Sequence, residues 1–107
     1  NRELWLYDTQ SKKFSKLPGF ETNDIMPQWA DKRTLFFLSS NDGTYNLYRL
    51  KINDDGSAIG TSEKITNYKD EAIRYYSVSA DGQTIVFEKD MRLYTMKTAD
   101  KNSAKPI

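Results

Sequence analysis

The amino-acid sequence predicts an all-β fold built from repeated four-stranded antiparallel units. Short apolar and aromatic runs follow one another along the 107 residues, and the linkers between them are rich in Asn, Asp, Gly and Ser. The runs recur with a period of about 40 to 50 residues. No segment shows the sustained 3.6-residue apolar period of an amphipathic helix, so the helical crossovers that parallel sheets need are not expected.

The first hairpin is expected near the start of the chain. Leu4–Tyr7 is an apolar and aromatic run, residues 8–13 form a polar turn, and Phe14–Leu17 returns as the second strand. Residues 18–19, Pro-Gly, then end the hairpin, because both residue types interrupt regular structure.

A complete four-stranded unit is expected next. Its first strand, Ile25–Trp29, contains Pro27, which lacks a backbone N–H donor and therefore predicts an edge position or an inner strand with few partners on one side. Leu35–Leu38 is apolar at every position, which indicates a strand buried on both faces. A turn at residues 40–44 leads to the third strand, Tyr45–Ile52.

The same order then recurs. A loop at residues 53–57 leads to the expected fourth strand, Glu63–Thr66, and the next unit starts with Tyr75–Val78. The dipeptide at residues 81–82, Asp-Gly, is a direct hairpin signal, because glycine adopts positive φ at no steric cost. The two strands that follow this turn are Ile85–Phe87 and Met91–Met96.

Equivalent positions can be matched between the units. Leu47 corresponds to Leu93 at a separation of 46 residues, and Leu4 stands 43 residues before Leu47. The position after each leucine is aromatic, as expected for side chains that pack one unit against the next: Trp5, Tyr48 and Tyr94. Repeats of this length with four short strands are typical of β-propeller blades, which lie between two neighbours and need not alternate apolar with polar residues.

We therefore predict a partial β-propeller of about two to two and a half four-stranded antiparallel blades, not closed on its own. Residues 1–107 form a single propeller fragment, in which 1–17 is the outer half of a blade, 24–66 is one blade and 72–107 is the next. Uncovered apolar faces and strand edges promote association. The expected partners are the remaining blades of the parent propeller, and the isolated fragment is expected to self-associate.

The composition excludes several kinds of site. The chain has no His and no Cys, so it cannot supply a Ser-His-Asp or Cys-His arrangement, a disulfide, or an imidazole or thiolate metal site. Asp54-Asp55-Gly56 suggests a calcium loop but lacks the spaced acidic ligands, so a turn is the favoured interpretation. We predict no catalytic, cofactor-binding or metal-binding residue, and the chain by itself is not expected to be an enzyme.

Charge and hydropathy argue against two further kinds of partner, nucleic acid and the membrane interior. Lys and Arg number 16 against 15 Asp and Glu, so no excess of basic residues favours nucleic acid. No apolar run reaches the length of about 18 residues that membrane insertion needs, and the first residues lack the features of a signal peptide. Since the sequence starts without Met, we expect Asn1 to be a cut point in a longer polypeptide. Localisation stays open between the bacterial cytoplasm and the periplasm or envelope.

Candidate contact residues lie on the predicted innermost strand of the last blade, whose rim faces the central channel of a propeller. We identify Arg74 and Tyr75 there as possible channel contacts for a peptide or protein ligand. The other aromatic residues are expected to serve packing instead of forming a platform for ligands or bases.

One stretch resembles a known repeat. It runs from Pro27-Gln28-Trp29-Ala30-Asp31 through Leu35–Ser40 and Asn41-Asp42-Gly43 to Asn46-Leu47-Tyr48. This pattern resembles the TolB-like propeller repeat, which combines Pro-x-Trp, an Asp-Gly turn and Asn-Leu-Tyr. Together with Ile65–Tyr68, Ala80-Asp81-Gly82 and Ile85–Phe87, it is similar to the first, six-bladed propeller of tricorn-type proteases. The turn at Ala30-Asp31-Lys32 lacks the Pro and Gly of the repeat, and Val78 replaces its Trp.

The resemblance implies a function that depends on a larger protein. In tricorn-type proteases the propellers flank a serine-protease core and guide or filter peptides toward it, and the catalytic residues lie in other domains. The chain would then be a non-catalytic segment of such a protease. The alternatives are a TolB-like protein-binding module of the bacterial envelope, a prolyl-oligopeptidase relative, or blades that are purely structural.

Overall fold

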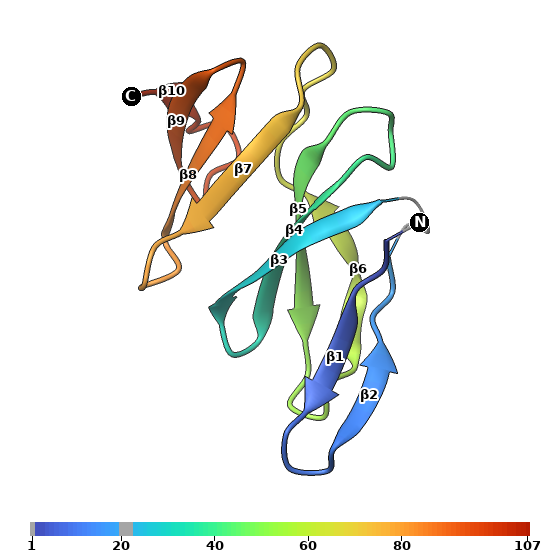
Figure 1. Cartoon of the computed structure of the whole chain (residues 1–107). Helices are drawn as coiled ribbons and strands as arrows, with labels where there is room; N and C mark the ends of the chain where they lie inside the picture. Colours follow the sequence, from blue (N-terminus) through green and yellow to red (C-terminus); the bar gives the residue numbers. More distant parts are fainter. Residues whose placement is uncertain (1, 20–22) are drawn as a thin grey trace.

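The computed structural model describes residues 2–19 and 23–107, and these residues form three separate antiparallel sheets (Figure 1). No described residue is helical, so no helix there could cross a membrane. The strands are β1 (Trp5–Asp8), β2 (Lys13–Lys16), β3 (Asp24–Asp31), β4 (Thr34–Ser39), β5 (Asn46–Ile52), β6 (Ala58–Lys64), β7 (Ile73–Val78), β8 (Thr84–Lys89), β9 (Arg92–Lys97) and β10 (Lys105–Pro106).

Each sheet is a simple meander in chain order. The first sheet contains β1 and β2, the second has the order β3-β4-β5-β6, and the third has the order β7-β8-β9-β10. The sheets lie side by side along the chain, with β3 and β7 as neighbouring innermost strands (Figure 1). The predicted all-β fold of unclosed, four-stranded antiparallel blades is confirmed.

The Asp-Gly hairpin turn forms as predicted, and its glycine has a second role. Gly82 has φ +72°, and its N–H donates to the Ser79 carbonyl at 2.9 Å. A Cβ atom on Gly82 would lie only 2.8 Å from the backbone oxygen of Ala30 in the second sheet. Glycine is therefore required both by the turn conformation and by the close approach of two blades.

The fourth strand of the second sheet begins earlier than the predicted Glu63–Thr66. Residues 53–57 close into a tight turn, in which Asn53 N–H donates to the Ser57 carbonyl at 2.8 Å. The chain therefore pairs with β5 from Ala58 onward, with a register shift between Arg49 and Lys51. Ile65 and Thr66 follow the strand and are buried in the linker to the next sheet.

Two apolar cores lie between the sheets. The core between the first and second sheets contains seven buried residues: Leu4, Leu17, Leu35, Phe37, Tyr48, Leu50 and Ile52. The core between the second and third sheets contains nine: Phe36, Leu38, Leu47, Ile65, Ile73, Tyr76, Ile85, Phe87 and Met96. Consecutive residues of Leu35–Leu38 enter opposite cores, which explains why that strand does not alternate apolar with polar residues.

The repeated aromatic position behaves differently in the three sheets. Tyr48 stacks on Phe37 with ring centroids 5.8 Å apart, and Tyr94 stacks on Phe87 at 5.2 Å. Both tyrosines pack in the cores between sheets, as predicted. Trp5 is 57% exposed, because it lies on the face of the first sheet that no other described strand covers.

Candidate functional site

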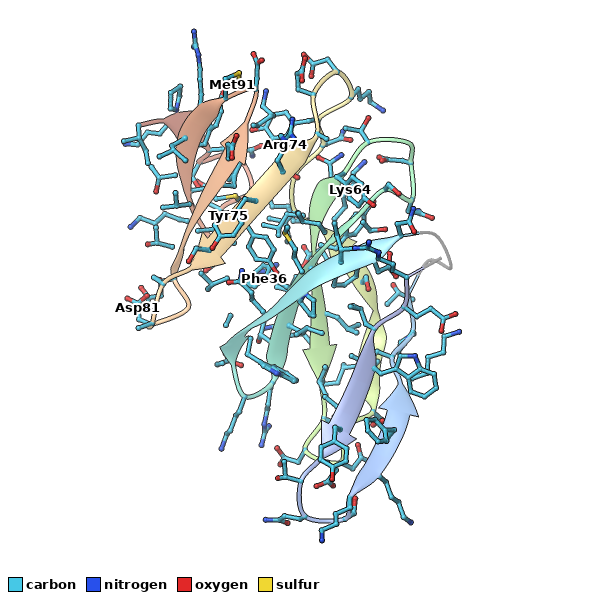
Figure 2. The ribbon with its side chains drawn as sticks, in the orientation of Figure 1. Phe36, Lys64, Arg74, Tyr75, Asp81 and Met91 are labelled. Carbon is cyan, nitrogen blue, oxygen red and sulfur yellow. The ribbon has the colours of Figure 1, made fainter. Side chains whose placement is uncertain are left out.

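The two predicted channel contacts lie on β7, the innermost strand of the third sheet (Figure 2). The pairing of β7 with β8 shifts between Ile73 and Tyr75, so Arg74 is the extra residue of a β-bulge. Arg74 and Tyr75 are both exposed, Tyr75 by 55%. A bulge turns side chains out of the regular alternation of a strand, so the direction of the Arg74 side chain does not follow from the alternation of its neighbours.

Tyr75 points toward one face of its sheet. It is paired with Glu88, which is paired in turn with Leu93, so these three side chains share a face. The neighbouring Tyr76 is fully buried on the opposite face, in the core with the second sheet. Tyr75 therefore faces away from the second sheet, and its contact with a channel ligand stays a prediction.

The inner edges of the second and third sheets are joined by one glutamine. Gln28 on β3 donates its Nε2–H to the Tyr76 carbonyl at 2.8 Å, and its Oε1 accepts from the Val78 N–H at 3.2 Å. Among the described strands, β7 pairs only with β8. The amide of Gln28 thus satisfies the free edge of β7 in the way that a neighbouring strand would.

The Tyr76 hydroxyl makes a second connection between the sheets. It lies 2.5 Å from the carbonyl oxygen of Met26 and 2.9 Å from that of Phe36, and it can donate its single proton to one of them at a time. Burial raises the pKa of Tyr76 well above its ordinary value, so the hydroxyl stays protonated. Tyr76 therefore acts as a fixed donor inside the core.

Replacing Gln28 with alanine should lower the free energy of unfolding by about 1–3 kcal/mol, because two backbone groups of β7 lose their partners. Urea denaturation followed by tryptophan fluorescence measures the change. Gln83→Ala is the matched control, since Gln83 is exposed on the turn before β8 and its backbone N–H, which the substitution keeps, donates to Asp81 Oδ1. Equal stability of the two variants would contradict the role of Gln28.

A buried asparagine holds the linker between the second and third sheets. Asn46 Nδ2 donates to the Tyr68 carbonyl at 2.9 Å and the Thr44 carbonyl at 3.3 Å. Its Oδ1 accepts from the Thr66 hydroxyl and the Tyr68 N–H, both at 2.8 Å. The Thr66 oxygen accepts in turn from the Leu47 N–H at 2.9 Å. Every polar atom of the Asn46 side chain is therefore engaged, although the side chain is fully buried.

An ion-pair network connects the outer parts of the same two sheets. Glu63 contacts Lys101 at 2.5 Å and Arg49 at 2.6 Å, and Arg49 Nη1 also donates to the Thr98 carbonyl at 3.0 Å. The Lys101 ammonium and the Arg49 guanidinium lower the pKa of Glu63 to about 2. Since Glu63 is largely exposed, solvent screening keeps the contribution of these pairs to stability small.

A groove beside this network lies between the second and third sheets. It is lined by the linker residues 64–68 and by Lys101, Asn102 and Ala104. Lys64 is already paired with Asp42 and bonded to Asn67, and Lys101 is paired with Glu63. The two cations are therefore neutralised, which makes the groove a poor anion site.

No cluster of three or more potential metal-ligating side chains occurs in residues 2–19 and 23–107. The suggested calcium loop is a turn, in which Asp55 Oδ1 accepts from the N–H and hydroxyl of Ser57 at 2.9 and 2.6 Å. Glycine 56 adopts φ +89° in this turn.

Sequence reasoning missed the residue that connects the inner strands β3 and β7 and the residue that holds the linker between the second and third sheets. Gln28 and Asn46 both stand in the stretch that resembles the propeller repeat, but neither was assigned a role. Their partners lie 48 to 50 and 20 to 22 residues away along the chain. The sequence marks them only weakly: Gln28 is a polar residue directly after a strand proline, and Asn46 is a polar residue directly before a Leu-Tyr pair.

Comparison with known proteins supports the fold. No family model and no curated protein matches the chain. The crystal structure of the tricorn protease matches with a TM-score of 0.73 and 20% identity, over 95% of this chain and 9% of that chain. The putative TolB from Agrobacterium tumefaciens matches with a TM-score of 0.75 and 21% identity, over 97% of this chain and 40% of that chain. The chain spans less than half the length of either structure, and its fold is that of a β-propeller segment.

Proposed function

We propose that this β-propeller segment is a non-catalytic part of a larger, tricorn-like serine protease, in which it helps to form a channel that guides or filters peptides. The observation that carries the proposal is the match to the tricorn protease along 95% of the chain, which corresponds to only 9% of that protein. A segment of this relative size leaves room for a separate catalytic domain.

The composition is consistent with this division of labour. Without His or Cys, the chain cannot build the common nucleophile and base pairs of peptidases. It does expose a cation and an aromatic ring at the innermost strand, on Arg74 and Tyr75. A guanidinium binds carboxylates and carbonyl oxygens of peptides, and an aromatic ring packs against their side chains.

The test uses the full-length parent protein and peptides of increasing length. Arg74→Ala and Tyr75→Ala are expected to raise KM for long peptides about three- to tenfold, which corresponds to the loss of one or two weak contacts, with kcat unchanged. A short fluorogenic substrate that bypasses the channel should be cleaved at the original rate. The control is Arg92→Ala, an exposed arginine on β9. Unchanged KM at every peptide length would refute channel contact by these residues.

A TolB-like protein-binding module is the second candidate. The observation in its favour is the match to the putative TolB. Its TM-score is 0.75 against 0.73 for the tricorn protease, and its identity is 21% against 20%. On this reading the parent has no protease domain and binds a folded protein partner. Absence of peptidase activity in the parent, with retained binding of a protein partner, would favour it. If Arg74→Ala and Tyr75→Ala changed neither activity nor binding, the reading of the blades as purely structural would remain.

A further inference from the structure

A groove at one end of the second sheet is lined by a row of side chains from three strands. Lys51 on β5 is paired with Thr34 on β4 and with Ile59 on β6, so these side chains lie side by side on one face of the sheet. Phe36, two residues after Thr34, shares that face and enters the core with the third sheet. We call this groove, of about 530 Å³, the basic groove; its lining residues are Asp31, Lys32, Arg33, Thr34, Lys51 and Ile59.

The basic groove lies just beyond the point where the second and third sheets meet. Arg49, two residues before Lys51 on the same face, donates to the Thr98 carbonyl after β9 at 3.0 Å. Gly82 lies against the Ala30 carbonyl at the same limit. Figure 1 shows the β3–β4 turn and the end of β5 extending past the third sheet. Further blades of a longer propeller would pack on the first sheet and on the far face of the third, so they would leave this groove open.

The centre of the basic groove is apolar. Ile59 is 52% exposed there. The aliphatic stem of Lys51 stands beside it on the adjoining strand, and such stems cover apolar surface while the charged end stays in water. An aliphatic side chain of a ligand can therefore pack on Ile59 and on the stem of Lys51, which removes apolar surface from water.

Three cations surround this apolar centre. The Lys51 ammonium donates to Thr34 Oγ1 at 3.0 Å, which is a neutral acceptor and uses one of the three N–H donors. Arg33 Nη2 contacts Asp54 at 2.7 Å, but both side chains are more than half exposed, so a carboxylate of a ligand can take the place of Asp54. Lys32 is exposed in the turn between β3 and β4.

The charge balance of the basic groove favours an anionic ligand. Asp31 is bound to its own turn, where its Oδ1 accepts from the Arg33 N–H at 2.8 Å. Together with Asp54 it supplies two carboxylates against the three cations, so positive charge is in excess. A ligand that carries carboxylates is therefore attracted to the groove.

We propose that the basic groove binds an extended acidic segment of a protein partner, in which one aliphatic side chain is flanked by Asp or Glu. The aliphatic side chain packs on Ile59, and the flanking carboxylates bind Lys51 and Lys32. One exposed ion pair contributes little by itself, so the affinity is weak and depends on both kinds of contact. The site is separate from the channel contacts, and it requires the two complete sheets but neither the protease nor the channel of the proposed function.

The test uses the full-length parent protein and a fluorescein-labelled peptide, Glu-Glu-Leu-Glu-Glu. Fluorescence anisotropy measures its Kd, and mass spectrometry checks that the peptide stays intact. Lys51→Glu and Lys32→Glu should each weaken binding about five- to tenfold, and Ile59→Ser about three- to tenfold. Lys32→Glu keeps the bond between Lys51 and Thr34, so it tests the role of charge even if Lys51→Glu perturbs the sheet.

Matched variants outside the basic groove should bind the peptide like wild type. Lys69→Glu reverses the charge of an exposed lysine in the linker between β6 and β7. Met91→Ser removes an apolar side chain that is 90% exposed in the turn between β8 and β9 (Figure 2). Weakening by these two variants as large as that by Lys51→Glu and Ile59→Ser would mean that the groove has no special role.

Control peptides separate an acidic and aliphatic ligand from a simple anion. Gln-Gln-Leu-Gln-Gln and Glu-Glu-Ser-Glu-Glu should each bind at least about fivefold more weakly than the labelled peptide. Inorganic phosphate should compete no better than sodium chloride at the same ionic strength, because both act only by screening. Equal binding of the serine peptide, or stronger competition by phosphate, would reveal a simple anion site and overturn the proposal.

Two further results would overturn the proposal. One is a wild-type protein that does not bind the peptide. The other is binding that depends on Arg74 and not on Lys51 or Ile59, which would place the peptide in the channel and support the proposed function. Failure of the channel experiments, in contrast, leaves the basic groove untouched, because its test measures binding and alters other residues.

Discussion

Asn46→Ala is expected to lower the free energy of unfolding by about 3–5 kcal/mol, which is a large part of the stability of a small domain. The substitution removes four hydrogen bonds at once, so the Thr44 carbonyl, the Thr66 hydroxyl and the N–H and carbonyl of Tyr68 lose the Asn46 side chain as a partner. Breaking hydrogen bonds in a buried network costs more free energy than breaking the same number at the surface, because water cannot take the place of the lost partner.

Urea denaturation with tryptophan fluorescence measures this effect. The control is Asn102→Ala, because Asn102 is exposed in the turn after β9, and its backbone N–H, which the substitution keeps, donates to Asp100 Oδ1. Its stability should stay within about 0.5 kcal/mol of wild type. A change below 1 kcal/mol in Asn46→Ala would show that the linker is held by other contacts.

Tyr76→Ala is expected to cost about 3–5 kcal/mol through the cavity left by a fully buried ring. Tyr76→Phe should cost about 1–2 kcal/mol, because the carbonyl groups of Met26 and Phe36 lose a donor while the ring is kept. Since Tyr76 joins the second and third sheets, amide hydrogen exchange should rise first in β7 to β9.

The matched control lies next to it on the same strand. Tyr75→Phe removes the same hydroxyl from a ring that is 55% exposed, and it should change stability by no more than about 0.5 kcal/mol. If Tyr75→Phe and Tyr76→Phe lowered the free energy of unfolding by similar amounts, burial of the hydroxyl against the second sheet would not be the cause of the effect.

The all-β class and the boundaries of most strands could be predicted because local chemistry determines them. The turn at Asp81-Gly82 depends on a glycine that tolerates positive φ, and Pro27 indeed lies on β3, the end strand of its four-stranded sheet. The start of β6 was predicted wrongly, because the segment Ala58–Glu63 is largely exposed and has no apolar pattern to mark it.

The candidate site could be predicted only in outline. Arg74 and Tyr75 were identified from their place on an innermost strand, and they do lie on β7. The face on which Tyr75 lies depends on the bulge at Arg74, and a shift of one residue moves a side chain to the opposite face. No sequence pattern placed that bulge.

By itself the sequence determined the repeat, the antiparallel connections and the two-sided burial of Leu35–Leu38, since these follow from turn residues and apolar runs a few positions apart. The tertiary structure alone decided that Gln28 connects β3 to β7, that Asn46 holds the linker between the second and third sheets, and that Trp5 is exposed while Tyr48 is buried. These features depend on which sheet packs against which. The position of a residue in the repeat does not determine whether another sheet covers it.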